Sequence, residues 1–284
     1  MLGINLLLWT LRPTAADRPL FEVVKGMGYG LVEVPVLALD EAECRAVGRI
    51  CDELGLARTA LAARGAEDNP LSDDPGIRRL AAEHGRADLD KAAALGATQL
   101  IGPIHAPFCV FTGAAPTKEE WRRGCDHMAE MADAARARGI TLSIEVLQRF
   151  ECYVLNTTAD GARFVKDVGA DNLGMLYDTF HANIEDPNIG PTLSKHAGAI
   201  NHVHLSENHR GTLGTGMIRW DETFAALRDI GYGGHLVIEV FSPSVQAVVP
   251  LLHLWRKTFD SEEAAARDSL AFVSARLGDR RKAA

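Results

Sequence analysis

Short apolar runs alternate with longer amphipathic stretches from one end of the chain to the other. The amphipathic stretches, such as residues 75–94 and 118–138, carry apolar positions at helical spacing, and helix-stopping glycines precede several of the apolar runs. The apolar runs have the length of buried strands, and eight occur, at about residues 3–9, 31–36, 56–62, 98–104, 140–146, 173–178, 200–205 and 235–241. Eight strand–helix units in series, without a long linker or a break in composition, predict one (β/α)₈ barrel domain over residues 1–284.

An open, doubly wound parallel sheet is the alternative arrangement of the same units. Such sheets often carry a glycine-rich phosphate-binding turn after the first strand, whereas this chain continues from Trp9 to Pro13 without a glycine. Polar residues occur at several of the predicted strand ends, and an open sheet would place these residues along a line. A barrel would gather them around a ring.

Each of the last four apolar runs contains, at or near its end, an acidic or imidazole side chain: Glu145, Asp178, His204 and Glu239. The separations are 33, 26 and 35 residues, about the length of one strand plus its returning helix. Side chains that end successive parallel strands converge at one rim of a barrel, where active sites are built. Three carboxylates and one imidazole at that rim predict a site for a hard or borderline divalent cation. The alternative is that each is an isolated polar residue at a strand end.

Composition narrows the class of protein. The 284 residues are 47% apolar and 24% charged, which suits a large globular domain with a full core. A net charge of −8 argues against a nucleic-acid partner, because phosphates would be repelled. No segment approaches the run of about 18 apolar residues that crosses a bilayer, and the apolar start lacks the basic lead of a signal peptide. With an odd number of cysteines, five, and no CxxC pair, we expect reduced thiols in a cytoplasmic protein.

Two stretches depart from the plain repeat, residues 63–74 after the third predicted strand and residues 102–116 after the fourth. Both follow strands, so we expect them at the same rim as the candidate metal site, where loops often carry function. Phe108 and Phe111 in the second stretch would either wall a small-molecule pocket or plug the top of the barrel.

The segments around the four strand ends resemble the ketose 3-epimerases of the xylose-isomerase-like TIM-barrel superfamily, which act on D-tagatose, D-psicose and L-ribulose. The resemblance is close over about residues 140–241 and rests on strand spacing alone before that. The matching segments are IEVLQRFECYVLN (144–156), DTFHANIE (178–185), HVHLSENHRGTLGTGMIRW (202–220) and VIEVF (237–241).

The resemblance implies a role for each matching position. One divalent ion, for which we expect Mn²⁺ with Co²⁺ or Mg²⁺ as possibilities, would be held by Glu145, Asp178, His204 and Glu239. The two glutamates of that set would also face each other across C3 of the sugar as catalytic groups. The oxygens at the C1–C2 end would be bound by Glu151, His181 and Arg210. The enzyme would then be an isomerase with a small ketose as its substrate, and we expect a homo-oligomer, either a dimer or a tetramer.

The chemistry of epimerisation agrees with these residue types. Inverting C3 of a ketose requires removal of the proton beside the C2 carbonyl and return of a proton on the other face. A divalent cation on the C2 and C3 oxygens would polarise the carbonyl and stabilise the enediolate. Two carboxylates on opposite faces would then serve as base and acid, and Arg210 and His181 would donate hydrogen bonds to the oxygen at C2.

Several polar residues near the site keep a second interpretation. Glu151 is either a substrate ligand or a surface acid, and His181 is either a substrate donor or a partner of a metal ligand. His202 shares a strand face with His204, and we expect it inside the barrel or beside a metal ligand. Glu33, at the end of the second strand, is a weaker candidate for the pocket, and Glu207 and His209 are left without a role.

Four other functions compete with ketose epimerisation. Aldose–ketose and hydroxypyruvate isomerases share the barrel and a similar metal set, so an isomerase is the main alternative. A sugar-phosphate epimerase differs only in the substrate loops, and these loops do not identify the sugar. A multi-metal phosphodiester hydrolase would need more His and Asp at strand ends than the chain has. A sugar-binding barrel without catalysis would not need both Glu145 and Glu239.

Overall fold

Eight parallel strands close into a barrel in the computed structural model, which describes residues 1–278. The strands pair in chain order, and β1 pairs with both β2 and β8, which confirms the predicted (β/α)₈ barrel. The strands are β1 (Leu2–Asn5), β2 (Leu31–Pro35), β3 (Ala57–Leu61), β4 (Gln99–Gly102), β5 (Thr141–Glu145), β6 (Leu173–Asp178), β7 (Ile200–Leu205) and β8 (His235–Ile238).

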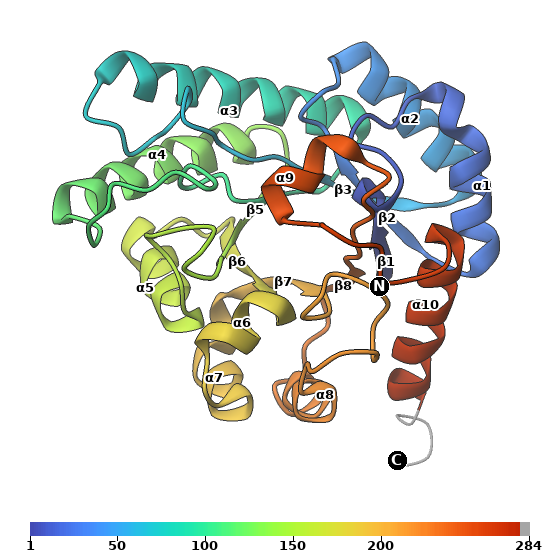
Figure 1. Ribbon diagram of the computed structural model, residues 1–284. Helices are drawn as coiled ribbons and strands as arrows, with labels where there is room; N and C mark the ends of the chain where they lie inside the picture. The colour runs from blue at the N-terminus through green and yellow to red at the C-terminus, as the bar shows by residue number, and fades with distance from the viewer. Residues whose placement is uncertain (279–284) are drawn as a thin grey trace.

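Helices surround the barrel on its outside, as Figure 1 shows in a view onto the ring of strands. The α-helices are α1 (Arg18–Met27), α2 (Glu41–Leu54), α3 (Pro75–Leu95), α4 (Lys118–Arg136), α5 (Thr158–Val168), α6 (Thr179–Glu185), α7 (Ile189–His196), α8 (Trp220–Asp229), α9 (Val249–Leu252) and α10 (Glu262–Gly278). Four short 3₁₀ helices complete the set, namely η1 (Leu6–Leu8), η2 (Ala15–Asp17), η3 (Ala197–Ala199) and η4 (Gln246–Val248).

The C-terminal charged run, residues 279–284, lies outside the described residues, so its predicted exposure stays a prediction. Among residues 1–278, no helix combines the length and the apolar character that crossing a membrane requires.

Local sequence explains where the helices begin and end. Thr117 accepts a hydrogen bond from the Glu120 N–H at 3.1 Å, and the Glu120 carboxylate accepts one from the Thr117 N–H at 2.7 Å, which forms a capping box at the start of α4. The end of α3 is set by Gly96, whose φ of 75° lies in the left-handed region that glycine adopts without strain. Such caps fix the residues at which these helices begin and end.

The first strand is shorter than the apolar run predicted. Residues 3–9 were expected to form a strand, but β1 ends at Asn5 and the chain turns into η1. The reason is the Asn5 side chain, whose Oδ1 accepts a hydrogen bond from the Leu7 N–H at 2.9 Å and so caps the 3₁₀ turn. The eighth strand also ends early, at Ile238, and Glu239 follows it directly.

The interior of the barrel is partly polar, whereas bulky branched side chains usually fill such barrels. Gln99 donates a hydrogen bond to Ser143 Oγ at 2.6 Å, and Ser143 Oγ donates one to Asn201 Oδ1, also at 2.6 Å. His202 Nδ1 lies 2.8 Å from Gln99 Oε1. Gln99, Ser143 and Asn201 therefore satisfy one another, which offsets the cost of placing their polar groups inside the barrel.

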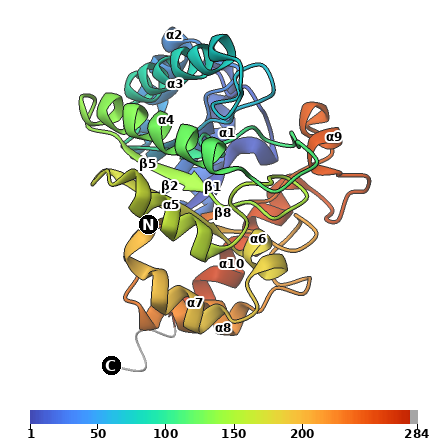
Figure 2. The same cartoon turned by 90° about the vertical axis from the view of Figure 1, so that its left-hand side faces the viewer.

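An apolar cluster covers part of the rim formed by the C-terminal ends of the strands. It joins strand ends to the segment after β8 and contains Leu7, Leu61, Ile101, Leu176, Phe241, Val245, Val248 and Leu254. The segment includes η4 and α9, and α9 lies in front of the barrel in Figure 1 and projects from one side of it in Figure 2. The rest of the core lies mainly between the strands and the outer helices.

Candidate metal and substrate site

The four predicted strand-end residues meet in one buried cluster. Each of Glu145, Asp178, His204 and Glu239 offers a ligand atom, and these atoms all lie within 4.8 Å of one another. His204 Nδ1 lies 3.2 Å from Glu239 Oε1 and 3.9 Å from both Glu145 Oε1 and Asp178 Oδ2. The strands β5 to β8 therefore bring together the set that the sequence predicted.

This cluster has the donor chemistry of a divalent metal site. His204 Nδ1 is buried, faces three carboxylates and has no hydrogen-bond partner of good geometry. Three carboxylate oxygens and one imidazole nitrogen suit Mn²⁺ or Mg²⁺, whose octahedral coordination leaves two positions for other oxygens. A closed tetrahedral zinc site usually contains thiolates, and no cysteine belongs to the cluster among the described residues.

Burial and neighbouring charges shift the pKa values of the two glutamates of the cluster in opposite directions. Burial, and next the charge of Glu239, raises the pKa of Glu145 well above its usual value. Burial would also raise the pKa of Glu239, but His204 and Arg210 outweigh it and lower that pKa. Burial raises the pKa of Asp178 to about 7. Unequal carboxylates in one site are typical of pairs that divide acid and base roles.

Arg210 is held rigidly beside the cluster. Its Nη1 donates to Glu239 Oε2 at 2.9 Å and to Asp178 Oδ2 at 3.2 Å, and its guanidinium carbon lies 3.7 Å from the centre of the Phe180 ring. The backbone of Arg210 has a φ of 59°, a left-handed conformation that is uncommon outside glycine. The Arg210 N–H donates to Glu207 O at 2.8 Å, and the Phe241 N–H donates to Arg210 O at 2.9 Å, which stabilises that conformation.

His181 presents a hydrogen-bond donor toward the same carboxylates. The Gln148 N–H donates to His181 Nδ1 at 3.1 Å, which assigns the proton of the neutral ring to Nε2. That Nε2 lies 3.6 Å from Glu145 Oε1. Arg210 Nη2, which is also a donor, lies 3.2 Å from Nε2, so both groups present N–H donors to the same space. Burial, with the charge of Arg210 second, lowers the pKa of His181 well below its usual value, so the ring stays neutral.

Glu151 is buried, which excludes the alternative that it is a surface acid. Only 7% of the residue is exposed, and Oε2 has no hydrogen-bond partner and lies 3.9 Å from Arg210 Nη2. Burial raises the pKa of the Glu151 carboxyl. An unpaired buried acceptor of this kind is available for a hydroxyl group of a ligand.

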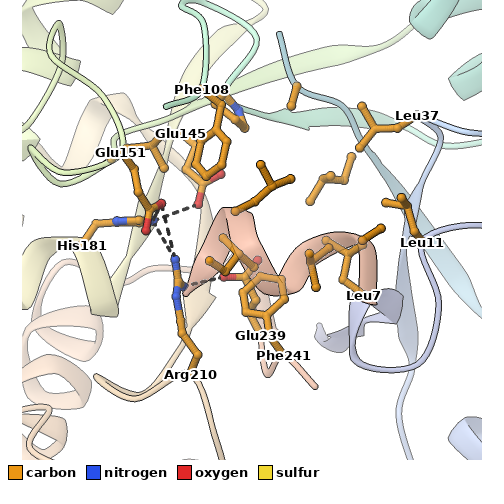
Figure 3. Close-up of a pocket in the computed structure, with 18 residues that line it drawn as sticks. Leu7, Leu11, Leu37, Phe108, Glu145, Glu151, His181, Arg210, Glu239 and Phe241 are labelled. Atoms are coloured by element: carbon orange, nitrogen blue, oxygen red, sulfur yellow. Dashed lines mark hydrogen bonds and ion pairs between the residues drawn. The ribbon is translucent and has the colours of Figure 1, made fainter. Parts of the chain in front are cut away.

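Glu145, Glu151, His181, Arg210 and Glu239 line one end of a cavity of about 190 Å³. Figure 3 shows Glu145, Glu151, His181 and Arg210 together on one side and Leu7, Leu11 and Leu37 on the other. The opposite end is lined mainly by aliphatic side chains, namely Leu7, Leu11, Leu37, Leu61, Val248, Leu251 and Leu252. The cavity is therefore polar at the cluster and apolar toward its other end.

The two long loops meet at this rim, as their positions after strands predicted. The Phe108 N–H donates to Arg64 O at 2.9 Å, and the Arg64 N–H donates to Pro103 O at 3.1 Å. Ala63, Pro103 and Phe108 line the cavity. Phe111 does not line it and is 49% exposed, so of the two phenylalanines only Phe108 walls the pocket.

The remaining polar residues near the site have structural partners. Glu207 holds its loop together, because its carboxylate accepts hydrogen bonds from the backbone of Gly214 at 2.9 Å and from the Trp220 ring N–H at 2.9 Å. His209 contacts its own loop through the Gly211 N–H at 3.1 Å. Glu33 lies beneath the cluster, not in the cavity lining. His202 lies inside the barrel, where it was expected.

Some residues of the site carry no clear signal in the sequence. Asn5 and Thr59 both contact Glu33 from inside the barrel. Asn5 is a single polar residue in an apolar run, and Thr59 follows Arg58 within another such run, so neither stands out in the sequence. The apolar wall from η4 and α9 comes from a segment whose leucines and valines look like ordinary core positions. Only the closure of the barrel brings these residues to the site.

Comparisons with known proteins agree with this arrangement. Residues 21–276 match the family described as xylose isomerase-like TIM barrel. The chain is 31% identical to the L-ribulose 3-epimerase of Mesorhizobium japonicum, over 90% of this chain and 87% of the relative. It is also 31% identical to the D-psicose 3-epimerase of Agrobacterium fabrum, over 97% of this chain and 99% of the relative.

A solved structure of an L-ribulose 3-epimerase superposes with a TM-score of 0.94 at 31% identity, covering 99% of this chain and 96% of that one. The strand ends, the buried cluster and these relatives lead to one assignment. The chain belongs to the ketose 3-epimerases of the xylose isomerase-like TIM barrel family, and it is an isomerase.

Proposed function

We propose that this chain epimerises a free ketose at C3 by proton transfer between the sugar and two glutamates. The observation that carries the proposal is the pair Glu145 and Glu239, buried in one four-residue cluster at the polar end of the cavity. Relatives named for D-psicose and L-ribulose, at about one-third identity over nearly the whole chain, support the same reaction.

A divalent ion would be held by Glu145, Asp178, His204 and Glu239, for which their donor atoms fit. When bound, it would supply Lewis-acid chemistry, polarising the carbonyl and stabilising negative charge on the sugar oxygens. Mn²⁺ is our first choice because carboxylate oxygens together with one imidazole nitrogen suit it.

The two glutamates do the proton chemistry. One carboxylate removes the proton from C3, and the other returns a proton to the opposite face, with their roles exchanged in the reverse reaction. Arg210 Nη1 holds Glu239 Oε2 at 2.9 Å, which fixes the direction of that carboxylate. The enediolate formed between C2 and C3 accepts hydrogen bonds from donors placed before the reaction begins.

The polar end of the cavity orients the sugar. His181 presents Nε2–H and Glu151 presents an unpaired carboxylate oxygen, so together they offer a donor and an acceptor to the C1 and C2 oxygens. Arg210 adds a fixed guanidinium beside them. This arrangement would place C3 nearest to the two glutamates.

The apolar end of the cavity favours a sugar without phosphate. Among the described residues that line the cavity, Arg210 is the one guanidinium or ammonium group, and Asp178 and Glu239 already engage it. A phosphate at the far end of the ketose would lie against leucines with no cation to compensate its desolvation. A free ketose loses much less hydration free energy than its phosphate on entering the same space.

A substrate panel with and without metal tests this proposal. The chelator-treated enzyme should be inactive, and Mn²⁺ or Co²⁺ should restore the activity. With Mn²⁺, free D-tagatose, D-fructose and L-ribulose should be epimerised, whereas their terminal phosphates should react at least about 100-fold more slowly in kcat/KM. Full activity in a metal-free preparation, or a preference for the phosphates, would contradict the proposal.

A further inference from the structure

We propose that Glu33 and Asn5 are positioning residues that join the metal ligand His204 to the catalytic carboxylate Glu239 through one set of hydrogen bonds. The inference rests on the proposed function, because it assigns supports for groups that the proposed function employs. Neither residue lines the cavity, so neither is expected to touch the substrate.

Glu33 is fully buried, and hydrogen-bond donors occupy both of its oxygens. Oε1 accepts from His204 Nε2 at 2.7 Å and from Asn5 Nδ2 at 3.1 Å, and Oε2 accepts from Thr59 Oγ1 at 2.9 Å. His202 Nε2 lies 3.1 Å from Oε2. A carboxylate has about four acceptor positions, and groups from three strands, β1, β3 and β7, surround this one. Three donors occupy three of the positions, and His202 Nε2 lies against the fourth.

This saturation separates Glu33 from the metal ligands. Glu33, His202 and His204 also lie close enough together to form a metal cluster by distance alone. However, three donors already bind the Glu33 carboxylate and His202 Nε2 crowds its remaining side, which leaves little room for an ion. The geometry therefore assigns Glu33 the role of orienting His204, with one ion per chain and none at the second cluster.

The contact with Glu33 determines which nitrogen of His204 is free. Because Nε2 carries the proton that it donates to Glu33, Nδ1 presents its lone pair when it serves as a ligand. That Nδ1 faces Glu145, Asp178 and Glu239. A carboxylate behind a ligating histidine fixes the ring orientation and strengthens the histidine as a ligand.

Asn5 extends the same support to Glu239. Its Nδ2 donates to Glu33 Oε1 and to Glu239 Oε1, both at 3.1 Å. The Leu7 N–H, which can only donate, binds Asn5 Oδ1 at 2.9 Å, so the amide cannot turn around. With Arg210 on Glu239 Oε2, both oxygens of Glu239 have a fixed donor.

Substitutions at Glu33 test its effect on the metal without any substrate. Glu33→Leu should weaken Mn²⁺ binding by about ten- to 100-fold in calorimetric titrations, the usual loss for such a support. Glu33→Gln should weaken it less, because its amide oxygen can still accept from His204 and Asn5. As a matched control, Thr223→Val removes a buried threonine hydroxyl that bonds Arg219 O, far from the site, and should bind Mn²⁺ normally.

A proton resonance gives an independent readout of ring orientation. In the Mg²⁺-loaded protein, the Nε2–H of His204 should exchange slowly with solvent because it is buried and bonded to Glu33. The resonance should persist in Glu33→Gln and disappear in Glu33→Leu. Glu33→Gln keeps the test decisive if the leucine variant does not fold.

Asn5→Ala should test the support of Glu239 separately from the support of His204. Since Asn5 does not contact His204, Mn²⁺ affinity should stay within about threefold of the unaltered enzyme, while kcat for C3 epimerisation falls about tenfold or more. KM should change little, because Asn5 does not line the cavity. An unchanged kcat would assign Asn5 only the role of capping η1.

The possible outcomes distinguish this inference from the proposed function. Normal Mn²⁺ affinity and a protected His204 proton in a folded Glu33→Leu protein would overturn the positioning role. Two Mn²⁺ ions per unaltered chain, falling to one in Glu33→Leu, would make Glu33 a ligand instead. If the unaltered enzyme bound no Mn²⁺, the proposed function itself would fail.

Discussion

The two halves of the barrel contribute different parts of the site. Strands β5 to β8 end in or next to the residues of the candidate metal cluster, Glu145, Asp178, His204 and Glu239. Strands β1 to β3 carry Asn5, Glu33 and Thr59. Asn5 and Thr59 both contact Glu33, and Asn5 and Glu33 contact the cluster from below. Leucines from that first half line the other end of the cavity.

The difference shows that residue type at a strand end does not decide its role. Glu33 and Glu145 are both glutamates on parallel strands of one barrel, and both are buried. Donors saturate Glu33, whereas Glu145 faces other carboxylates and lines the cavity. Glu145 therefore remains open to an ion and a substrate, whereas Glu33 supports the cluster from outside the cavity, and the predictions below test that division.

The largest expected effect comes from removing either catalytic carboxylate in the second half. Glu145→Gln and Glu239→Gln should each reduce the epimerisation rate by about 10²–10⁴-fold or more, because one carboxylate cannot serve both faces of C3. The measurement is the initial rate with saturating ketose and Mn²⁺. Glu130→Gln, at an exposed position of α4, is the matched control and should keep the normal rate. A substantial rate in either site variant would remove that glutamate from the mechanism.

A smaller loss of activity is expected from removing the guanidinium group that joins the cluster to the substrate. Arg210→Ala should lower kcat by about 10²–10³-fold, the usual effect of losing one preorganised donor to a developing oxyanion. The bound metal should stay close to one ion per chain by elemental analysis, because Arg210 is not a ligand. Arg210→Lys should recover only part of the rate, since an ammonium group lacks the planar fork. Unchanged kinetics would assign Arg210 a structural role.

The smallest effect should come from the apolar end of the cavity. Leu251 lines it and is 49% exposed, so Leu251→Ala removes only part of a buried contact. We expect kcat/KM for a free ketose to fall about fivefold, or about 1 kcal/mol, mainly through KM. A loss as large as that of Arg210→Ala would show that the apolar wall takes part in catalysis and would break the division between the two ends.

Much of the fold could be predicted because strand and helix periods are local properties of the sequence. The strands 173–178 and 200–205 agree with β6 and β7, and the four cluster residues stand out because polar side chains end apolar runs. The first strand was predicted too long because the run of leucines from Leu6 to Leu8 continues the apolar pattern. The cap that Asn5 provides for Leu7 stops the strand, and apolarity alone does not show it.

The parts of the site that could not be predicted depend on contacts between distant strands. Glu33 and His204 lie 171 residues apart, and Asn5 and Glu239 lie 234 residues apart. Neither pair has a local pattern that would identify it. Burial of Glu151 likewise depends on how its loop packs against Arg210, so its sequence allowed both a surface and a site interpretation.

The position at which solvent hydrogen enters the sugar tests the central claim most directly. The Mn²⁺-loaded enzyme would be incubated in D₂O with D-tagatose, D-fructose or L-ribulose, and the products analysed by NMR. We expect deuterium at C3 together with the C3 epimer, because proton transfer occurs between C3 and the two glutamates. Deuterium at C1 with formation of an aldose would contradict it and identify an aldose–ketose isomerase.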